Sequence, residues 1–185
     1  MTDPNEEVVK AFLEMKGFFV RTNVRYTVKE GKKASGQSDL DIVALNPNII
    51  QNGENLPFVL EAEHFGQISH LVMEIKGWHS EKITISTLKA HPRIFNFTRK
   101  EAKHKAVETL NHRDFISVLV ISQIGAKENS KEELFHELKE GGVNHILEFS
   151  TIMDYLKVEI KSNLNQDNLV LHSIRLANIY GELSK

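Results

Sequence analysis

The residues best suited to chemistry lie on two short stretches of the chain, at Asp41 and at Glu74-Ile75-Lys76. Each stretch adjoins a run of apolar residues, which predicts that both lie on strands. Side chains alternate between the two faces of a strand, so Glu74 and Lys76 should project to the same side. If the two strands are neighbours, Asp41 stands beside Glu74, and the paired carboxylates form an oxygen-rich site for Mg²⁺ or Mn²⁺.

Such a site suits the hydrolysis of a phosphate ester. A divalent ion would neutralise charge developing on the phosphate and acidify a bound water. Lys76 would orient that water or stabilise the phosphate. Asp39 shares the predicted strand face with Asp41 and competes for its role, and we favour Asp41 because it directly precedes the apolar run Ile-Val-Ala. The competing interpretation of the whole pattern is an edge strand with a surface ion pair.

The spacing Glu-x-Lys is not informative by itself, because it occurs six times in the chain. Five of the six copies fall in predicted helices or turns, where residues two apart do not share a face. Only Glu74 and Lys76 follow an apolar strand, Leu71-Val72-Met73, with an acid-bearing strand upstream. Charge at the end of a core strand is costly without a partner or a metal ion.

The elements that must position these residues follow from hydrophobic periodicity and from turn signals. Asp3 and Pro4 predict a helix start, with Glu6 completing a capping box, and Gly17 predicts its end. Residues 47–69 and 80–97 give no clear pattern, apart from a possible strand at 58–62. We predict strands at 18–28, 38–45, 70–76, 115–122 and 145–149, a turn at 30–36, and further helices at 98–110, 130–140, 150–162 and 168–183. Helices interleaved with an apolar central strand predict an α/β fold with a mixed sheet and helices on both faces.

Composition bounds the kind of protein. At 185 residues and 41% hydrophobic content, the chain fits one globular domain with a real core. It contains no cysteine, which excludes disulfides and thiolate metal sites and suits a reducing cytoplasm. No apolar run is long enough to cross a bilayer, and the acidic start lacks the features of a signal peptide. We therefore expect a cytoplasmic protein without a membrane partner.

Net charge is −2, but the charges are unevenly distributed. Residues 76–113 hold nine Lys or Arg against three Asp or Glu, whereas residues 128–185 hold ten acidic and six basic residues. This asymmetry predicts one positive face suited to a phosphate backbone; the alternative is a set of solvated helix faces. Trp78 is a further candidate for stacking on a base, although packing is the commoner role of a lone Trp. The candidate nucleic-acid-binding residues are Arg21, Arg25, Lys32, Lys33, Arg99, Lys100, Lys103 and Trp78.

From Glu6 to about residue 122, the chain resembles the PD-(D/E)xK nuclease superfamily, and within it the archaeal Holliday-junction resolvases and Mrr-like endonucleases. The resemblance rests on a leading helix with Glu6, a strand with Asp41, and a strand with Glu74-Ile75-Lys76, followed by a helix and a buried strand. It implies a restriction-endonuclease-like three-layer α/β/α fold with a core at about 4–122 and an elaboration at 123–185. Leu40 stands where that family often has proline, and residues 47–69 exceed what a compact resolvase needs.

The same resemblance implies a Mg²⁺- or Mn²⁺-dependent endonuclease that cleaves DNA, plausibly as a homodimer. It assigns metal binding to Asp41, Glu74, the carbonyl of Ile75 and, more weakly, Glu6, and catalysis to Asp41, Glu74 and Lys76. From the residues alone, Glu6 is as well explained as a capping residue. Two alternatives stay open: an inactive nuclease-like module that binds nucleic acid or protein, and a nuclease acting on RNA.

Overall fold

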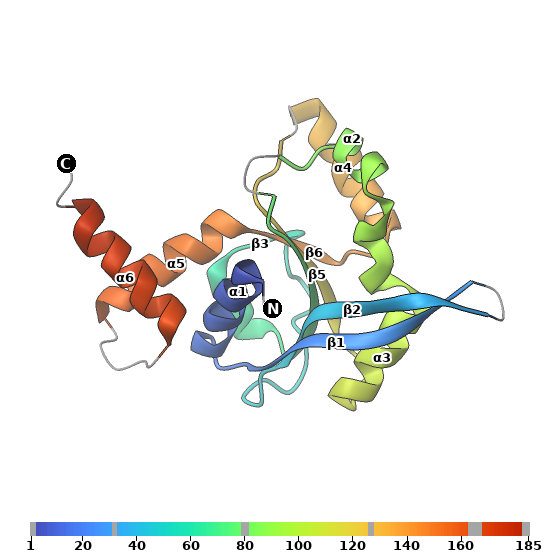
Figure 1. The fold of residues 1–185 in the computed structure, drawn as a ribbon, viewed down its shortest axis with the longest axis horizontal. Helices are drawn as coiled ribbons and strands as arrows, with labels where there is room; N and C mark the ends of the chain where they lie inside the picture. Colours follow the sequence, from blue (N-terminus) through green and yellow to red (C-terminus); the bar gives the residue numbers. More distant parts are fainter. Residues whose placement is uncertain (1–2, 31–32, 79–81, 126–127, 163–167, 183–185) are drawn as a thin grey trace.

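The computed structural model describes residues 3–30, 33–78, 82–125, 128–162 and 168–182, and it is a mixed α/β fold. Helices flank both faces of one six-stranded sheet, which confirms the fold class predicted from the sequence (Figure 1). The elements in chain order are α1 (Pro4–Met15), β1 (Phe19–Glu30), β2 (Lys33–Leu45), β3 (Val59–Leu60), η1 (Ala62–Gln67), β4 (His70–Lys76), α2 (Ile85–Ala90), η2 (Pro92–Thr98), α3 (Lys100–Leu110), β5 (Ile116–Ile121), α4 (Glu128–Glu140), β6 (His145–Glu148), α5 (Phe149–Ser162) and α6 (Leu169–Glu182).

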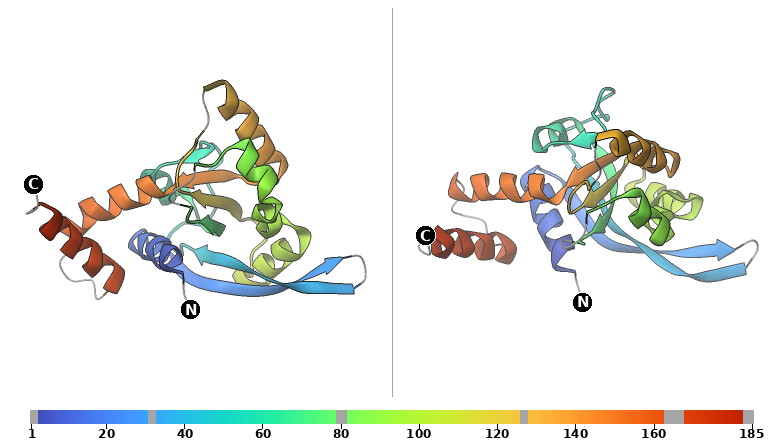
Figure 2. Two further views of the ribbon diagram at one scale, coloured as in Figure 1. Left: turned by 45° about the horizontal axis from the view of Figure 1, so that its top comes forward. Right: turned by 90° about the horizontal axis from the view of Figure 1, so that it is seen from above.

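The sheet has the order β1-β2-β4-β5-β6-β3. The pairs β1–β2 and β2–β4 are antiparallel, whereas β4, β5, β6 and β3 run parallel to their neighbours. Strands buried on both faces read as continuous apolar runs, and β5 has this character from Ser117 to Ile121. Beyond the part of β2 that pairs with β4, residues 24–30 of β1 and 33–40 of β2 continue as a two-stranded arm (Figures 1 and 2).

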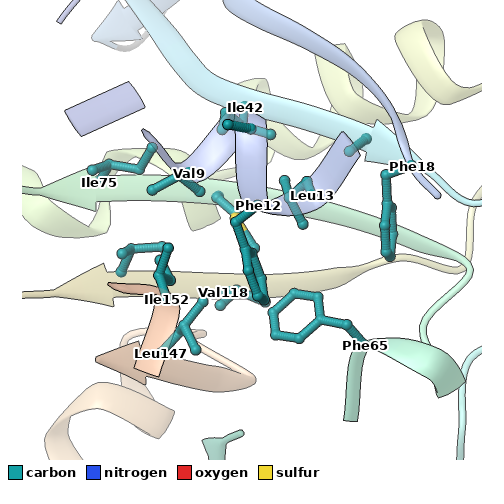
Figure 3. Packing of buried hydrophobic residues seen from close by; sticks show 14 of the residues in the cluster. Val9, Phe12, Leu13, Phe18, Ile42, Phe65, Ile75, Val118, Leu147 and Ile152 are labelled. Carbon is teal, nitrogen blue, oxygen red and sulfur yellow. The ribbon is translucent and has the colours of Figure 1, made fainter. Parts of the chain in front are cut away.

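One hydrophobic cluster lies between the sheet and the layer formed by α1, η1 and α5. Phe12, Phe65, Val118 and Leu147 meet there, and none of them is exposed (Figure 3). The rings of Phe12 and Phe65 pack edge to face with centroids 4.9 Å apart. Full burial of a side chain such as Phe12 stabilises the fold by about 1.5–3 kcal/mol, so this layer fixes α1 against the sheet.

A second cluster lies on the opposite face, under α2, η2, α3 and α4. Ile94, Phe97, Ala102 and Leu119 are fully or almost fully buried in it. α6 packs against α5 and α1 at the far end of the molecule from the arm (Figures 1 and 2). The two clusters hold helices on both sides of β4, and this is the strand that carries Glu74 and Lys76.

Helix α1 begins and ends where the sequence predicts. Asp3 accepts a hydrogen bond from the backbone N–H of Asn5 at 2.8 Å and so caps the helix. Gly17, at φ 87°, ends it, and the N–H of Phe18 then bonds the carbonyl of Leu13. The predicted capping box is wrong, because Glu6 directs its carboxylate to Asn23 instead.

Two other predictions differ from the structure, and one stretch that gave no clear pattern contains helices. The predicted turn at 30–36 is too long, since β1 runs to Glu30 and β2 begins at Lys33, and residues 31–32 lie outside the described residues. The possible strand at 58–62 shrinks to the two residues of β3, and a 3₁₀ helix follows it. The ambiguous stretch 80–97 contains α2 and most of η2. Among the described helices, none has the length and apolar character needed to cross a membrane.

Candidate active site

The strands β2 and β4 separate at the position of the predicted chemistry. Their backbone pairing runs from Leu45–His70 to Ile42–Met73, and the next residues along the two strands are Asp41 and Glu74. There, Asp41 Oδ2 accepts the backbone N–H of Ile75 at 2.6 Å. A side-chain carboxylate thus replaces the ladder bond that a paired backbone would have made. Asp41 is thereby fixed at the fork between the two strands.

Glu74 and Lys76 form an ion pair at the same fork. Lys76 Nζ lies 2.5 Å from Glu74 Oε1, and their side chains are 25% and 9% exposed, respectively. Their neighbours Met73 and Ile75 belong to the cluster under α1, so Glu74 and Lys76 face the side of η2 and α3, as alternation requires. The structure therefore brings together the three residues to which the sequence assigned catalysis.

The fork coincides with an irregularity in β1. Asn23 has φ 54°, a left-handed conformation that is uncommon for residues other than glycine. It stands between the pairs Thr22–Ile42 and Val24–Leu40, opposite Asp41. Leu40 packs in one hydrophobic cluster, whereas Ile42, two residues on, packs in the other. The regular alternation of β2 is therefore interrupted at Asp41, where the arm leaves the body of the sheet.

Glu6 approaches this fork from α1. It is 9% exposed, and its Oε2 accepts a hydrogen bond from Asn23 Nδ2 at 2.7 Å. Burial raises the pKa of Glu6, with the charges of Asp41 and Asp39 adding to the effect and the Asn23 bond opposing it. Gly77 lets the start of α1 approach the end of β4, since a side chain there would collide with Asn5.

The charges at the fork are poorly solvated and of one dominant sign. Burial, and then the charge of Asp41, raises the pKa of Glu74 from 4.5 to about 7 despite the nearby Lys76. Burial also raises the pKa of Asp41, against the opposing effects of the Ile75 N–H and Lys76. For Lys76, burial lowers the pKa, but the neighbouring carboxylates of Glu74 and Asp41 outweigh this effect and raise the pKa. The site thus holds excess negative charge that one ammonium does not balance.

The donor atoms fit a hard divalent cation. Among the described residues, Asp41 Oδ1 and Glu74 Oε2 have no hydrogen-bond partner, so each acid keeps one oxygen available. Mg²⁺ is bound in proteins by one or two carboxylates, with water completing its shell. In the same part of the chain, however, no group of three or more His, Cys, Asp or Glu gathers closely enough to hold a metal ion. The protein would therefore supply only part of the coordination shell.

The predicted nucleic-acid-binding residues fall into separate groups. Arg21 and Arg25 are exposed on β1, and Arg99, Lys100 and Lys103 are exposed at the start of α3. Lys32 lies outside the described residues, and Lys33 is in β2 with its side chain outside the description. Trp78 is half-buried, and its ring centroid lies 4.7 Å from that of His91, which is the packing role that the sequence favoured.

Sequence reasoning missed three residues that shape the site. Asn23, in the middle of a strand, was a possible signal, because Asn is depleted in strands and tolerates a left-handed conformation. Tyr26 donates a hydrogen bond to the carbonyl of Asn96 at 3.1 Å and lies within electrostatic reach of Glu74. Asn96 Oδ1 is buried without a partner among the described residues. Contacts between Tyr26 and Asn96 span 70 positions of the chain, so no local pattern reveals them.

Asp39, the rival of Asp41, lies near the same charges but is placed differently. It stands across from Arg25 in the β1–β2 pairing and acts electrostatically on Asp41, Glu74 and Lys76. Of the two acids, Asp41 is the one whose carboxylate accepts a hydrogen bond from the backbone of β4.

No family model, curated protein or solved structure matches this chain.

Proposed function

We propose that this protein is a divalent-metal-dependent nuclease that hydrolyses phosphodiester bonds, with DNA as the expected substrate. The observation that carries the proposal is the fork itself, where the buried carboxylate of Glu74, the half-buried carboxylate of Asp41 and one ammonium converge between β2 and β4. A structural ion pair would need one acid and one base. Here two acids with raised pKa values share a single lysine, and groups perturbed in this way cluster at functional sites.

The cation would be held by Asp41, Glu74 and the carbonyl of Ile75. Glu6 approaches the same fork, but among the described residues it does not gather with the two acids closely enough to form a three-acid metal site. When bound, it would neutralise charge on the phosphate and make a water molecule more acidic. Asp41 is suited to this role because its bond to the Ile75 N–H fixes the carboxylate in one orientation. Glu74 is suited because burial has removed the water that would otherwise solvate its charge.

Lys76 is a donor rather than a base in this proposal. Because neighbouring carboxylates raise its pKa above the usual value of 10.5, it stays protonated at neutral pH. A protonated lysine cannot remove a proton from water, but it can hold a phosphate oxygen and stabilise negative charge as it develops. A quarter of its side chain is exposed, so a substrate can reach it from solvent.

Glu6 and Asn23 would support the fork from the other side. The Asn23 amide holds the carboxylate of Glu6 at 2.7 Å, and the left-handed conformation of Asn23 places that amide opposite Asp41. Strained residues of this kind persist where surrounding structure fixes them, often at functional sites. The proposal extends to the fold: the α/β/α layering and the strand order are consistent with the PD-(D/E)xK nuclease resemblance of the sequence.

Cleavage assays test the proposal directly. The protein is incubated with duplex DNA, branched DNA and structured RNA, in Mg²⁺ or in EDTA, and products are separated by electrophoresis. We expect cleavage in Mg²⁺ only, and a loss of at least about 100-fold in Lys76→Met. Lys131→Met on α4 is the matched control and should cleave normally. Equal cleavage in EDTA and Mg²⁺, or full activity of Lys76→Met, would refute the proposal. Preferential cleavage of RNA would change the proposed substrate from DNA to RNA and leave the proposed site unchanged.

A second candidate is a nuclease-like module that binds without cutting. One observation favours it: Lys76 already occupies Glu74 Oε1, and no group of three His, Cys, Asp or Glu that could hold a metal ion forms within the described part of the chain. Titration of Mg²⁺ and Mn²⁺ into the protein, followed by calorimetry and thermal unfolding, separates the two. The nuclease requires a metal effect that Asp41→Asn abolishes, whereas the binding module requires none.

A further inference from the structure

A groove opens beside the fork, between the arm and α3. It has a volume of about 630 Å³. Arg25 and Tyr26 of β1 line one wall, and Lys100, His104 and Lys105 of α3 line the other. Cavities of 300–1,000 Å³ hold ligands of drug size, so this groove suits one or two nucleotides of a single strand rather than a duplex.

The positive charges in this groove are available for a ligand. Among the described residues, neither Arg25 nor Lys100 forms an ion pair, although Arg25 stands across from Asp39 in the strand pairing. Lys105, in contrast, is already held by Glu108, with both carboxylate oxygens 3.1 Å from its Nζ. Glu101 is also on the helix wall. Arg25 and Lys100 are therefore the cations that the protein itself leaves uncompensated.

The donors on α3 follow a line. Lys100 and His104 are four residues apart on one helix, so they lie one above the other on the same face, with about 5–6 Å between their Cβ atoms. Lys103, which is also exposed on α3, is not among the residues that line the groove. A row of donors facing an arginine suits a linear chain of anions.

Tyr26 connects the groove to the fork. Its ring forms part of the groove wall, and its hydroxyl donates to the carbonyl of Asn96 in η2. The same phenol lies within electrostatic reach of Glu74, Asp39 and Arg99. Tyr26 is therefore the residue that the groove wall and the surroundings of Glu74 have in common.

We propose that this groove binds the phosphodiester backbone of one nucleic-acid strand, with Arg25 and Lys100 on the phosphates and His104 as a further donor. This deepens the proposed function and rests on it for the choice of nucleic acid over other polyanions. Arg25 supplies a planar fork of donors that matches a phosphate, and Lys100 supplies a point charge. The groove then holds the strand next to the bond that Lys76 and the carboxylates would attack.

Binding measured without cleavage tests the groove. Fluorescence anisotropy of a labelled single-stranded oligonucleotide is followed across salt concentrations, in protein carrying Asp41→Asn to prevent cutting. Adding Arg25→Gln and Lys100→Gln should weaken binding and lower the slope of log K against log salt by about 1.4, since each phosphate contact to a single strand contributes roughly 0.7. The matched control adds Lys89→Gln and Lys131→Gln, on α2 and α4, and should leave the slope unchanged.

Further arms make each outcome decisive. Arg25→Lys with Lys100→Arg keeps both charges and should keep the slope. An unchanged slope in the Gln variant, with circular dichroism showing an intact fold, overturns the proposal. The proposal is also overturned if a poly-glutamate peptide binds as well as the oligonucleotide. It is overturned as well if Arg25 and Lys100 contribute to the binding of duplex DNA but not of the single strand. If wild-type protein binds the oligonucleotide as expected yet cleaves no substrate, the groove proposal stands and the nuclease proposal fails.

Discussion

The two ends of β4 both carry buried polar groups, but they satisfy them in opposite ways. At the start of the strand, Asn52 Oδ1 accepts from the N–H and the hydroxyl of Ser69 and from the N–H of His70, at 2.9–3.2 Å. The carbonyl of Ser69 in turn accepts the N–H of Asn46. Ser69 is completely buried, yet its groups have partners and none of them is ionised.

The other end of the strand holds ionisable groups with incomplete partners. Asp41 and Glu74 each keep one carboxylate oxygen without a hydrogen bond among the described residues, and both have raised pKa values. Folding alone gains nothing from such an arrangement, because buried charge without full compensation is destabilising. The first end therefore serves the fold, whereas the arrangement at the second end is the one that the proposed ligand would explain.

The largest expected effect separates the two ends by activity. Glu74→Gln should lower Mg²⁺-dependent cleavage by about 10²–10⁴-fold, because it removes a charge that the cation and the reacting phosphate require. His70→Gln, an equally small change at the other end of the strand, should leave the rate within about threefold of wild type. Single-turnover cleavage of a labelled duplex measures both. Similar losses in the two variants would show that neither end is specifically catalytic.

Stability should change in the reverse order. Asn52→Ala removes an acceptor shared by three donors and leaves the buried Ser69 groups unsatisfied, which should destabilise the fold by about 2–4 kcal/mol. Asp41→Asn keeps an oxygen for the Ile75 N–H and removes a half-buried charge, so it should be neutral or slightly stabilising. Urea denaturation of each variant at pH 7 gives the two free energies of unfolding. A large loss in Asp41→Asn would make the fork structural.

The pH dependence of stability should also reveal Glu74. Its folded pKa of about 7 lies above the unfolded value of 4.5, so the folded state binds the proton more tightly. The free energy of unfolding should therefore decrease as pH rises from about 4.5 to about 7, by at most about 3 to 4 kcal/mol at 1.36 kcal/mol per pH unit. Glu74→Gln should flatten this profile in denaturation curves without metal. An unchanged slope in that variant would contradict the assignment.

The sequence predicted which end of β4 carries the acid and the lysine because that signal is local. The strand itself was predicted to the residue, since a continuous apolar run ends at a charged Glu-x-Lys and a Gly. Alternation then placed Glu74 and Lys76 on one face. The partner strand was identifiable because Asp41 precedes an apolar run of its own. What the sequence could not supply was the bond from Asp41 to the Ile75 N–H, which depends on where the two strands separate.

The arm shows why other parts escaped prediction. Polar and glycine residues around 30–36 resemble a turn, yet β1 and β2 extend into them through cross-strand backbone pairing that has no hydrophobic pattern. Likewise α2 and η2 are short, and their position depends on burying Leu88, Ile94 and Phe97 under the sheet. Tertiary packing decided these elements, and it also set the conformation of Asn23 and the contact of Tyr26.

The smallest expected effect concerns the histidines at the start of β4. His70 and His112 stack with ring centroids 4.3 Å apart and planes within 7° of each other. Burial, and then the neighbouring His112, lowers the pKa of His70. A lowered pKa means that the unfolded chain binds the proton more tightly. Stability from this end is therefore fully present above about pH 6.5 and is lost as pH falls through the folded pKa, opposite to the trend at Glu74.

Measurement in the Glu74→Gln background makes this trend easier to detect, because the largest opposing titration is then absent. In that variant, the denaturation midpoint should decrease as the pH is lowered from 7.5 to 5.5. Adding His70→Gln should make this decrease smaller. His136→Gln, an exposed histidine on α4, is the matched control and should not affect it. A fall of the same size with and without His70 would locate the titrating group elsewhere. Opposite pH trends at the two ends of β4 would show that hydrogen-bonded neutral groups and incompletely partnered acids affect the pH dependence of stability in opposite directions.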